Sequence, residues 1–148
     1  MNMSPRACTL YPFSFEGAVI AKGTDPGLVA QTFHSALVVE LAKSGITALM
    51  PVPGSVDQEI VVRGHFVKMD GGSRLMRYFL TFFAGAAELE VEGAVGTPVM
   101  PVVQLHTKVT RRAGAGGGNS ASLLNDAARM AGERLAKQIA ASLAVPNA

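Results

Sequence analysis

The stretch from Glu88 to Thr110, ELEVEGAVGTPVMPVVQLHTKVT, consists of two alternating runs joined by a turn. In residues 88–95 a glutamate stands at positions 88, 90 and 92, and apolar or small residues occupy the other positions. Residues 101–110 alternate in the same way, with valine, leucine and threonine opposing glutamine, histidine and lysine. Side chains alternate across a strand, so this pattern predicts two half-buried strands. Gly96-Thr97-Pro98 suits the hairpin loop between them.

Helix signals flank this hairpin on both sides. Asp25-Pro26 combines a capping oxygen with a proline at the first helical position, and Gly45 can end the helix in a left-handed conformation. Asn119 or Ser120 caps a second predicted helix, which Pro146 ends. Both helices have apolar residues at spacings of three and four, which is typical of a helix with one buried face. The two apolar stripes are Val29, Phe33, Ala36, Leu37 and Leu41, and Leu124, Ala127, Ala128, Ala131, Leu135, Ile139 and Leu143.

Three further segments have the composition of extended chain. Residues 9–21 feed a strand, residues 46–50 form a short apolar strand before Pro51, and residues 59–70 are rich in β-branched residues. The predicted order is β-α-β-β-β-β-α. This order indicates an α+β fold with a single, mostly antiparallel sheet and both helices on one face. We expect an N-terminal arm at residues 1–8, one domain at residues 9–145 and a tail at residues 146–148.

Composition excludes several classes of protein. The 148 residues are 49% hydrophobic and 16% charged, which argues against disorder, and the net charge of +2 offers no basic surface for nucleic acid. Cys8 is the only cysteine, so an intrachain disulfide and a cysteine-based zinc site are both excluded. No apolar run reaches the roughly 20 residues of a transmembrane segment, and residues 1–7 lack the pattern of a signal peptide. Cytoplasm and periplasm both remain open.

Ionisable side chains that could act in catalysis or bind a metal lie on the polar side of the hairpin. A register pairing Glu92 with Gln104 also places Glu90 opposite His106 and Glu88 opposite Lys108. Carboxylates on a solvated face lack the burial that tunes a general acid or base, so we interpret this face as solvated. A small-ligand or metal site is the alternative interpretation. The candidate polar face comprises Glu88, Glu90, Glu92, His106 and Lys108.

No catalytic motif stands elsewhere in the sequence. Histidine occurs at positions 34, 65 and 106, without the short spacing of common metal sites, although His65 and His106 could meet across the sheet. There is no G-x-S-x-G motif, and the glycine-rich residues 114–120 lack the ending of a phosphate-binding loop. We therefore expect no catalytic residues, no metal and no cofactor.

Residues 70–87 follow neither a strand nor a helix period. Two arginines precede an almost unbroken apolar run, which suits either a buried crossover or an exposed patch. An exposed patch could mediate self-association or peripheral membrane contact, with the arginines available to acidic partners. The candidate interaction residues are Arg74, Arg77, Tyr78, Phe79, Phe82 and Phe83.

The same segment carries a family resemblance. GSRLMR at residues 72–77, followed by FAGAAELEV at residues 83–91, is similar to motifs of an uncharacterised bacterial envelope lipoprotein family, a domain of unknown function. That family shows G-S-R-x-x-R and then G-x-G-A-[AG]-x-L-x-V. Here the first glycine of the second motif is replaced, and no lipobox precedes Cys8. The element order also resembles, more distantly, the curli-secretion lipoprotein and the N-terminal domain of the Tol-system propeller protein.

The resemblance implies a location in the periplasm or at the outer membrane, with the cytoplasm as the alternative. It further implies a non-enzymatic cell-envelope protein that binds a partner protein or associates with itself. The small-ligand or metal-binding domain on the Glu/His/Lys face stays open as the alternative.

Overall fold

The computed structural model describes residues 6–71, 87–111 and 120–144. Their elements follow the order β1-β2-α1-β3-β4-β5-β6-α3. This confirms the predicted α+β class with a single sheet. The bounds are β1 Arg6–Leu10, β2 Val19–Ile20, α1 Pro26–Lys43, β3 Ile46–Leu49, β4 Ile60–Asp70, β5 Ala87–Gly96, β6 Pro101–Arg111 and α3 Ser120–Ala144.

Helix α1 begins and ends where its sequence signals predict. The side chain of Asp25 accepts a hydrogen bond from the backbone N–H of Leu28, with N and O 3.2 Å apart. Pro26 takes the first turn, and Gly45 follows the helix with φ of 78°. That left-handed conformation costs glycine little because it has no Cβ.

The sheet has the strand order β3-β1-β4-β5-β6, with β2 paired to the far part of β4. Strands β4, β5 and β6 form a long antiparallel ladder, whereas β1 pairs in parallel with both β3 and β4. Parallel neighbours need a crossover connection, and α1 provides it between β1 and β3.

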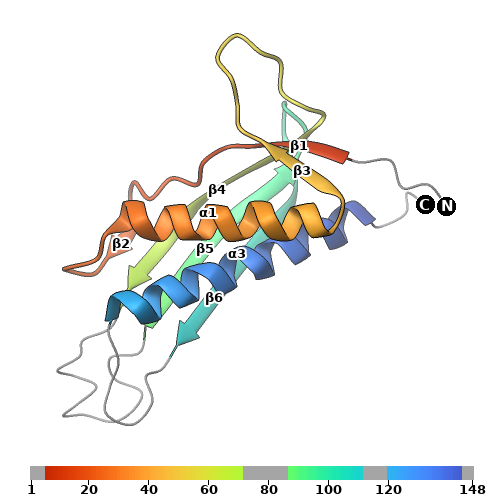
Figure 1. The fold of residues 1–148 in the computed structure, drawn as a ribbon. Coiled ribbons are helices and arrows are strands. Elements are labelled where there is room, and N and C mark those ends of the chain that lie inside the picture. Colours follow the sequence, from red (N-terminus) through yellow and green to blue (C-terminus); the bar gives the residue numbers. More distant parts are fainter. Residues whose placement is uncertain (1–5, 72–86, 112–119, 145–148) are drawn as a thin grey trace, which may run out of the picture.

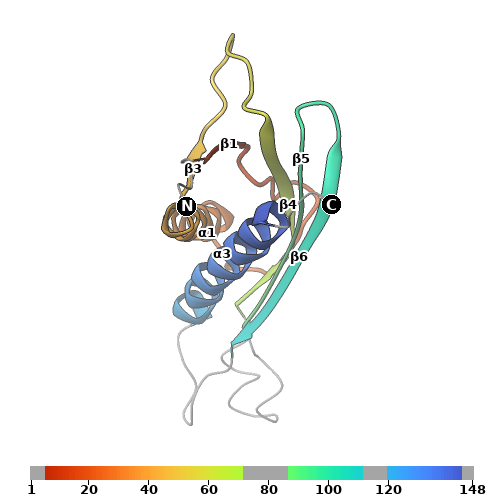
Figure 2. The same cartoon turned by 90° about the vertical axis from the view of Figure 1, so that its right-hand side faces the viewer.

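Both helices cover the same face of this sheet (Figures 1 and 2). Helix α3 packs against β5, β6 and α1, and α1 also contacts β3. The core lies between the two layers, around Phe33, Phe66 and Leu135. A Cβ at Gly132 would lie 2.5 Å from the carbonyl oxygen of Phe33, so the small residue permits the close approach of α3 to α1.

The first strand differs from the prediction. A loose arm was expected up to Cys8, but Arg6–Leu10 form β1 inside the sheet, and the Cys8 side chain is fully buried. The expected strand region at residues 9–21 contributes only the end of β1 and the short β2. Residues 6–10 lack a clear alternation, and Cys8, Thr9 and Leu10 are buried in succession, so side chains on both faces of the strand are covered.

Candidate binding surface on the open sheet face

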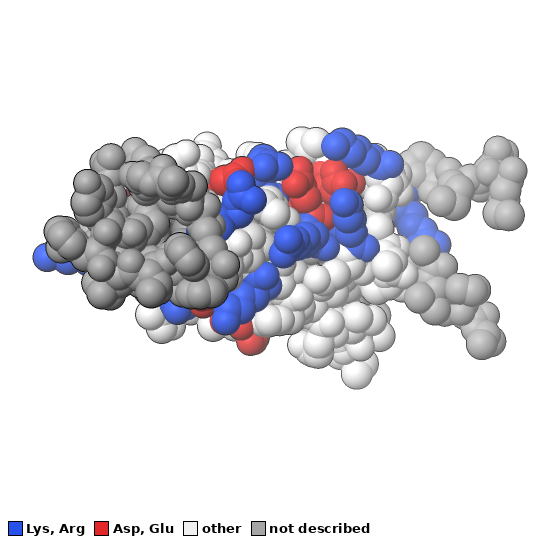
Figure 3. All heavy atoms as spheres, turned by 90° about the horizontal axis from the view of Figure 1, so that it is seen from below, with Lys and Arg blue, Asp and Glu red and all other residues white. Residues whose placement is uncertain are grey.

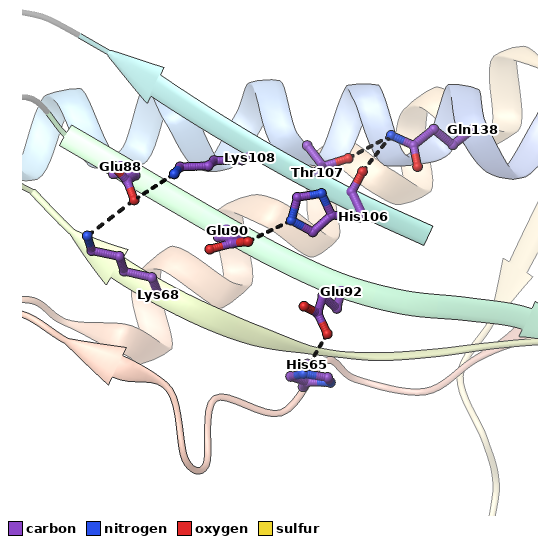
Figure 4. Close-up of polar contacts among 9 residues, drawn as sticks. All are labelled: His65, Lys68, Glu88, Glu90, Glu92, His106, Thr107, Lys108 and Gln138. Carbon is purple, nitrogen blue, oxygen red and sulfur yellow. Dashed lines mark hydrogen bonds and ion pairs between the residues drawn. The ribbon is translucent and has the colours of Figure 1, made fainter. Parts of the chain in front are cut away.

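The face of β4, β5 and β6 that points away from the helices is the open face of the sheet (Figure 2). Its side chains alternate with buried core residues, as the burial pattern of β5 shows most clearly. Three glutamates of β5 form the middle column of this face, between cationic or imidazole side chains of β4 and β6 (Figure 4). We call this set the polar lattice; it comprises His65, Lys68, Glu88, Glu90, Glu92, His106 and Lys108.

Glu88 is paired with two lysines. Its Oε1 atom lies 3.2 Å from Nζ of Lys68 and 3.5 Å from Nζ of Lys108 (Figure 4). The lysines come from the strands on either side of β5. Pairs this exposed stabilise a fold weakly, by about 0–1 kcal/mol each, so they set the charge of the surface more than its stability.

Each of the other two glutamates contacts a histidine instead. Nε2 of His106 lies 2.6 Å from Oε2 of Glu90, and Nε2 of His65 lies 3.6 Å from Oε2 of Glu92 (Figure 4). Oxygen or nitrogen atoms of Glu90, Glu92 and His106 all lie within 4.8 Å of one another, which makes them a candidate metal-binding group among the described residues.

The structure corrects the predicted hairpin register by two residues. Glu92 lies opposite His106 and Glu90 opposite Lys108, whereas Gln104 pairs with Ala94. The turn is longer than expected, because the N–H of Thr97 donates to the carbonyl oxygen of Met100 and closes a four-residue loop. A shift of two keeps every side chain on its predicted face. The expected contacts of Glu90 with His106 and of Glu88 with Lys108 therefore occur as diagonal pairs.

His65 and Lys68 complete the lattice from β4. The sequence placed His65 within reach of His106 but did not single out Lys68. Strict alternation from His65 would place Lys68 on the buried face, and the irregularity in the β4–β5 pairing between Phe66 and Lys68 brings it to the open face beside Glu88. Acidic and basic side chains also lie next to one another on the surface seen from below (Figure 3).

A pocket of about 610 Å³ opens beside the polar lattice, at the end where β5 turns into β6. Small residues such as Ala94 and Gly96 line it together with the larger Arg63, His65 and Gln104. The turn residues Val99 and Met100 form its apolar part. This pocket therefore combines polar groups with an apolar wall, as binding sites commonly do.

The loop between β3 and β4 projects from the same end of the molecule, because the start of β4 pairs with the end of β5 (Figure 1). Its base is held by the hydroxyl of Tyr11, which donates to Oδ2 of Asp57 over 2.6 Å. That hydrogen bond raises the pKa of Tyr11. The guanidinium of Arg63 lies 3.8 Å from the centre of the Tyr11 ring. We define the apolar end as the exposed residues Met50, Val52, Val56, Val99 and Met100.

The free edge of β6 is partly covered by α3. Nε2 of Gln138 donates to the carbonyl oxygen of His106 and to Oγ1 of Thr107, over 3.0 and 2.9 Å (Figure 4). At the last residue of β6, Nη2 of Arg111 lies 2.8 Å from Oδ2 of Asp126, in the first half of α3. Covering an edge in this way discourages pairing with a foreign strand.

The remaining predicted interaction residues, Arg74 to Phe83, lie outside the described residues. His34 does not join the polar lattice, because it is on α1, where it is half-buried and accepts a hydrogen bond from the backbone N–H of Phe13. Neither α1 nor α3 is long and apolar enough to cross a membrane, as far as the described residues extend.

Solved structures share the fold at low sequence identity. PelC from Paraburkholderia phytofirmans, solved as a dodecamer, has 12% identity and a TM-score of 0.55, covering 91% of this chain and 88% of that one. Protein XCC0632 from Xanthomonas campestris has 11% identity and a TM-score of 0.57, with coverages of 95% and 84%. Lipoprotein GNA1162 from Neisseria meningitidis has 10% identity and a TM-score of 0.51, with coverages of 93% and 99%.

No curated protein matches the sequence. A family model does match it, over residues 22–98, from just before α1 to the β5–β6 turn. This range is just over half of the chain and includes the β4–β5 ladder with all three glutamates of the polar lattice. The chain thus belongs to the family described as "Domain of unknown function (DUF4410)".

Proposed function

We propose that this chain is a non-enzymatic domain of the bacterial cell envelope that associates with itself through the apolar end. The exposure of the apolar end is the observation that carries the proposal. Val56 and Val99 are 92% and 91% exposed, on two loops that project from one end of the sheet. Exposed apolar side chains that gather at one end of a domain are candidates for an interaction site.

The adjoining pocket strengthens the case for a protein ligand. Val99 and Met100 form a wall of this pocket, and Arg63, His65 and Gln104 supply polar groups around it. An apolar centre with a polar rim is the usual composition of a protein interface. A second copy of the chain could place its own apolar end or an exposed edge segment there.

The fold likeness agrees with an assembling envelope protein. PelC, which shares the fold, was solved as a dodecamer, and GNA1162, which also shares it, is a lipoprotein of Neisseria meningitidis. The likeness supports a periplasmic or outer-membrane-associated location for this chain.

Sedimentation of matched variants tests the role of the apolar end. Val99→Glu with Met100→Glu is expected to shift the protein from oligomer to monomer, because two charges cannot be buried in an apolar contact. Val38→Glu with Val39→Glu is the control, since these side chains are exposed on α1 and the change in charge is the same. A monomeric wild type, or an oligomer that responds equally to both pairs, would refute the proposal.

Residues 74–83, which the sequence analysis singled out, are the competing candidate for the self-association interface. Phe82→Asp with Phe83→Asp tests it in the same experiment. If this pair alone abolishes association, the interface belongs to residues 74–83 and the apolar end is excluded. Co-sedimentation with anionic and neutral liposomes separates membrane contact from protein contact, because arginines favour anionic headgroups.

A further inference from the structure

The three glutamates of the polar lattice have different partners. Lys68 and Lys108 both lie directly opposite Glu90 in the strand registers. Their ammonium groups nevertheless contact Glu88, one step along β5. Glu90 and Glu92 are left with imidazoles as their close partners. The lattice therefore has a lysine-bound carboxylate at one end and two histidine-bound carboxylates at the other.

This difference in partners has a chemical consequence. The close ionic partners of Glu88 are two lysines, whereas those of Glu90 and Glu92, among the described residues, are histidines. The histidine end therefore places carboxylate oxygen atoms next to imidazole nitrogen atoms. A divalent cation could be held by these oxygen and nitrogen atoms together.

We propose that the histidine end of the polar lattice binds a divalent transition metal, with zinc as its representative. Glu90, Glu92 and His106 supply three ligand atoms already within 4.8 Å of one another. His65 reaches the same carboxylate from the opposite strand, since its Nε2 lies 3.6 Å from Oε2 of Glu92. Ligands of one tetrahedral zinc lie about 3.3 Å apart, so small side-chain rotations suffice.

The chemical types of the ligand atoms indicate which metals could bind. The three atoms that lie together come from one imidazole and two carboxylates, a mixed set of nitrogen and oxygen donors that suits zinc, copper or nickel, whereas magnesium and calcium prefer oxygen ligands throughout. The strands hold the ligands in register: His65, Glu92 and His106 are direct neighbours across β4, β5 and β6. The side chains of His65 and His106 are each 53% exposed, so the ion can enter from solvent without any opening of the fold.

Calorimetric titration of the untagged chain with zinc chloride at pH 7.5 tests this site. The wild type is expected to bind one zinc per chain, with no comparable heat from magnesium. His106→Gln and Glu90→Gln are each expected to weaken binding roughly tenfold or more, the scale on which even the outer partners of metal ligands act. His65→Gln is expected to weaken binding as well.

Glu88→Gln is the matched control. It removes one carboxylate from the same face of the same strand, but one that contacts lysines. Its zinc affinity is expected to stay close to that of the wild type. Equal losses for Glu88→Gln and Glu90→Gln would overturn the proposal in favour of diffuse attraction, and so would a folded wild type that binds no zinc. Neither result bears on self-association through the apolar end.

Discussion

The backbone N–H of Phe13 donates a hydrogen bond to Nε2 of His34, with the two nitrogen atoms 2.8 Å apart. This bond joins the segment between β1 and β2 to the middle of α1. The His34 ring also has a backbone hydrogen bond with Ala30. Burial lowers the pKa of His34, because the charged imidazolium would lose its hydration.

Stability should accordingly fall at acidic pH. The pKa of His34 is lower in the folded chain than the ordinary value of 6.5, so the unfolded chain binds the proton more readily. The free energy of unfolding should therefore decrease as pH drops below about 6.5, and it should be fully retained above that pH. Urea unfolding of the wild type and His34→Gln at several pH values measures this. The variant should be less stable at pH 8 but lose less on acidification; parallel curves would contradict the assignment.

Packing of Phe13 against a glycine pair should make β4 and β5 intolerant of larger residues there. Gly64 and Gly93 are opposite each other in the sheet, and the Phe13 ring lies against both. A Cβ at Gly64 would overlap this ring and lie 2.6 Å from the carbonyl oxygen of Glu92. Gly64→Ala should therefore destabilise the fold by about 1–3 kcal/mol.

Gly27→Ala is the control for that change. A Cβ at this position in α1 meets only an ordinary contact with Asp25, at 3.5 Å. Because alanine favours a helix over glycine, this variant should be stabilised by up to about 1 kcal/mol. Thermal unfolding of both variants compares the two effects, and equal shifts would show that Phe13 does not limit the space at Gly64.

The single thiol should be inert in the folded protein. Cys8 is fully buried in β1, and burial raises its pKa from 9.0 to about 11. At pH 8 the thiolate fraction is then about one in a thousand when folded and about one in ten when unfolded. Ellman's reagent should react at least about a hundredfold more slowly without urea than with it. Rapid labelling of the native chain would mean that β1 detaches from the sheet.

Gln138→Glu should weaken the attachment of α3 to the edge of the sheet. Glutamate has nearly the same shape but cannot donate to the carbonyl oxygen of His106 or to Oγ1 of Thr107. Thr107 is 4% exposed, so water replaces the lost donor poorly. The expected cost is about 1–3 kcal/mol in urea unfolding. Gln31→Glu on the exposed side of α1 provides the control and should change stability little.

Local patterns predicted much of this architecture. The alternation of residues 88–95 and 101–110 identified the β5–β6 hairpin and the side of each strand that faces solvent. Asp25 and Gly45 marked both ends of α1. These features depend on residues close in the chain, whose capping, turn and periodicity preferences act without knowledge of the rest of the fold.

Contacts between distant segments had to come from the tertiary structure. Strand β1 lies between β3 and β4 because α1 crosses over the sheet, and that placement buries Cys8 in a segment whose sequence suggested a loose arm. The four-residue turn at Thr97–Met100 set the register of the hairpin, which strand periodicity leaves undetermined by multiples of two.

The polar lattice depends both on the local sequence pattern and on the tertiary structure. Alternation along β5 determined that Glu88, Glu90 and Glu92 share one face, because side chains repeat every two residues in any strand. Only the pairing of three strands decided that Glu88 meets lysines while Glu90 and Glu92 meet histidines. That assignment depends on the distances between side chains on separate strands, and no local preference of the chain specifies those distances.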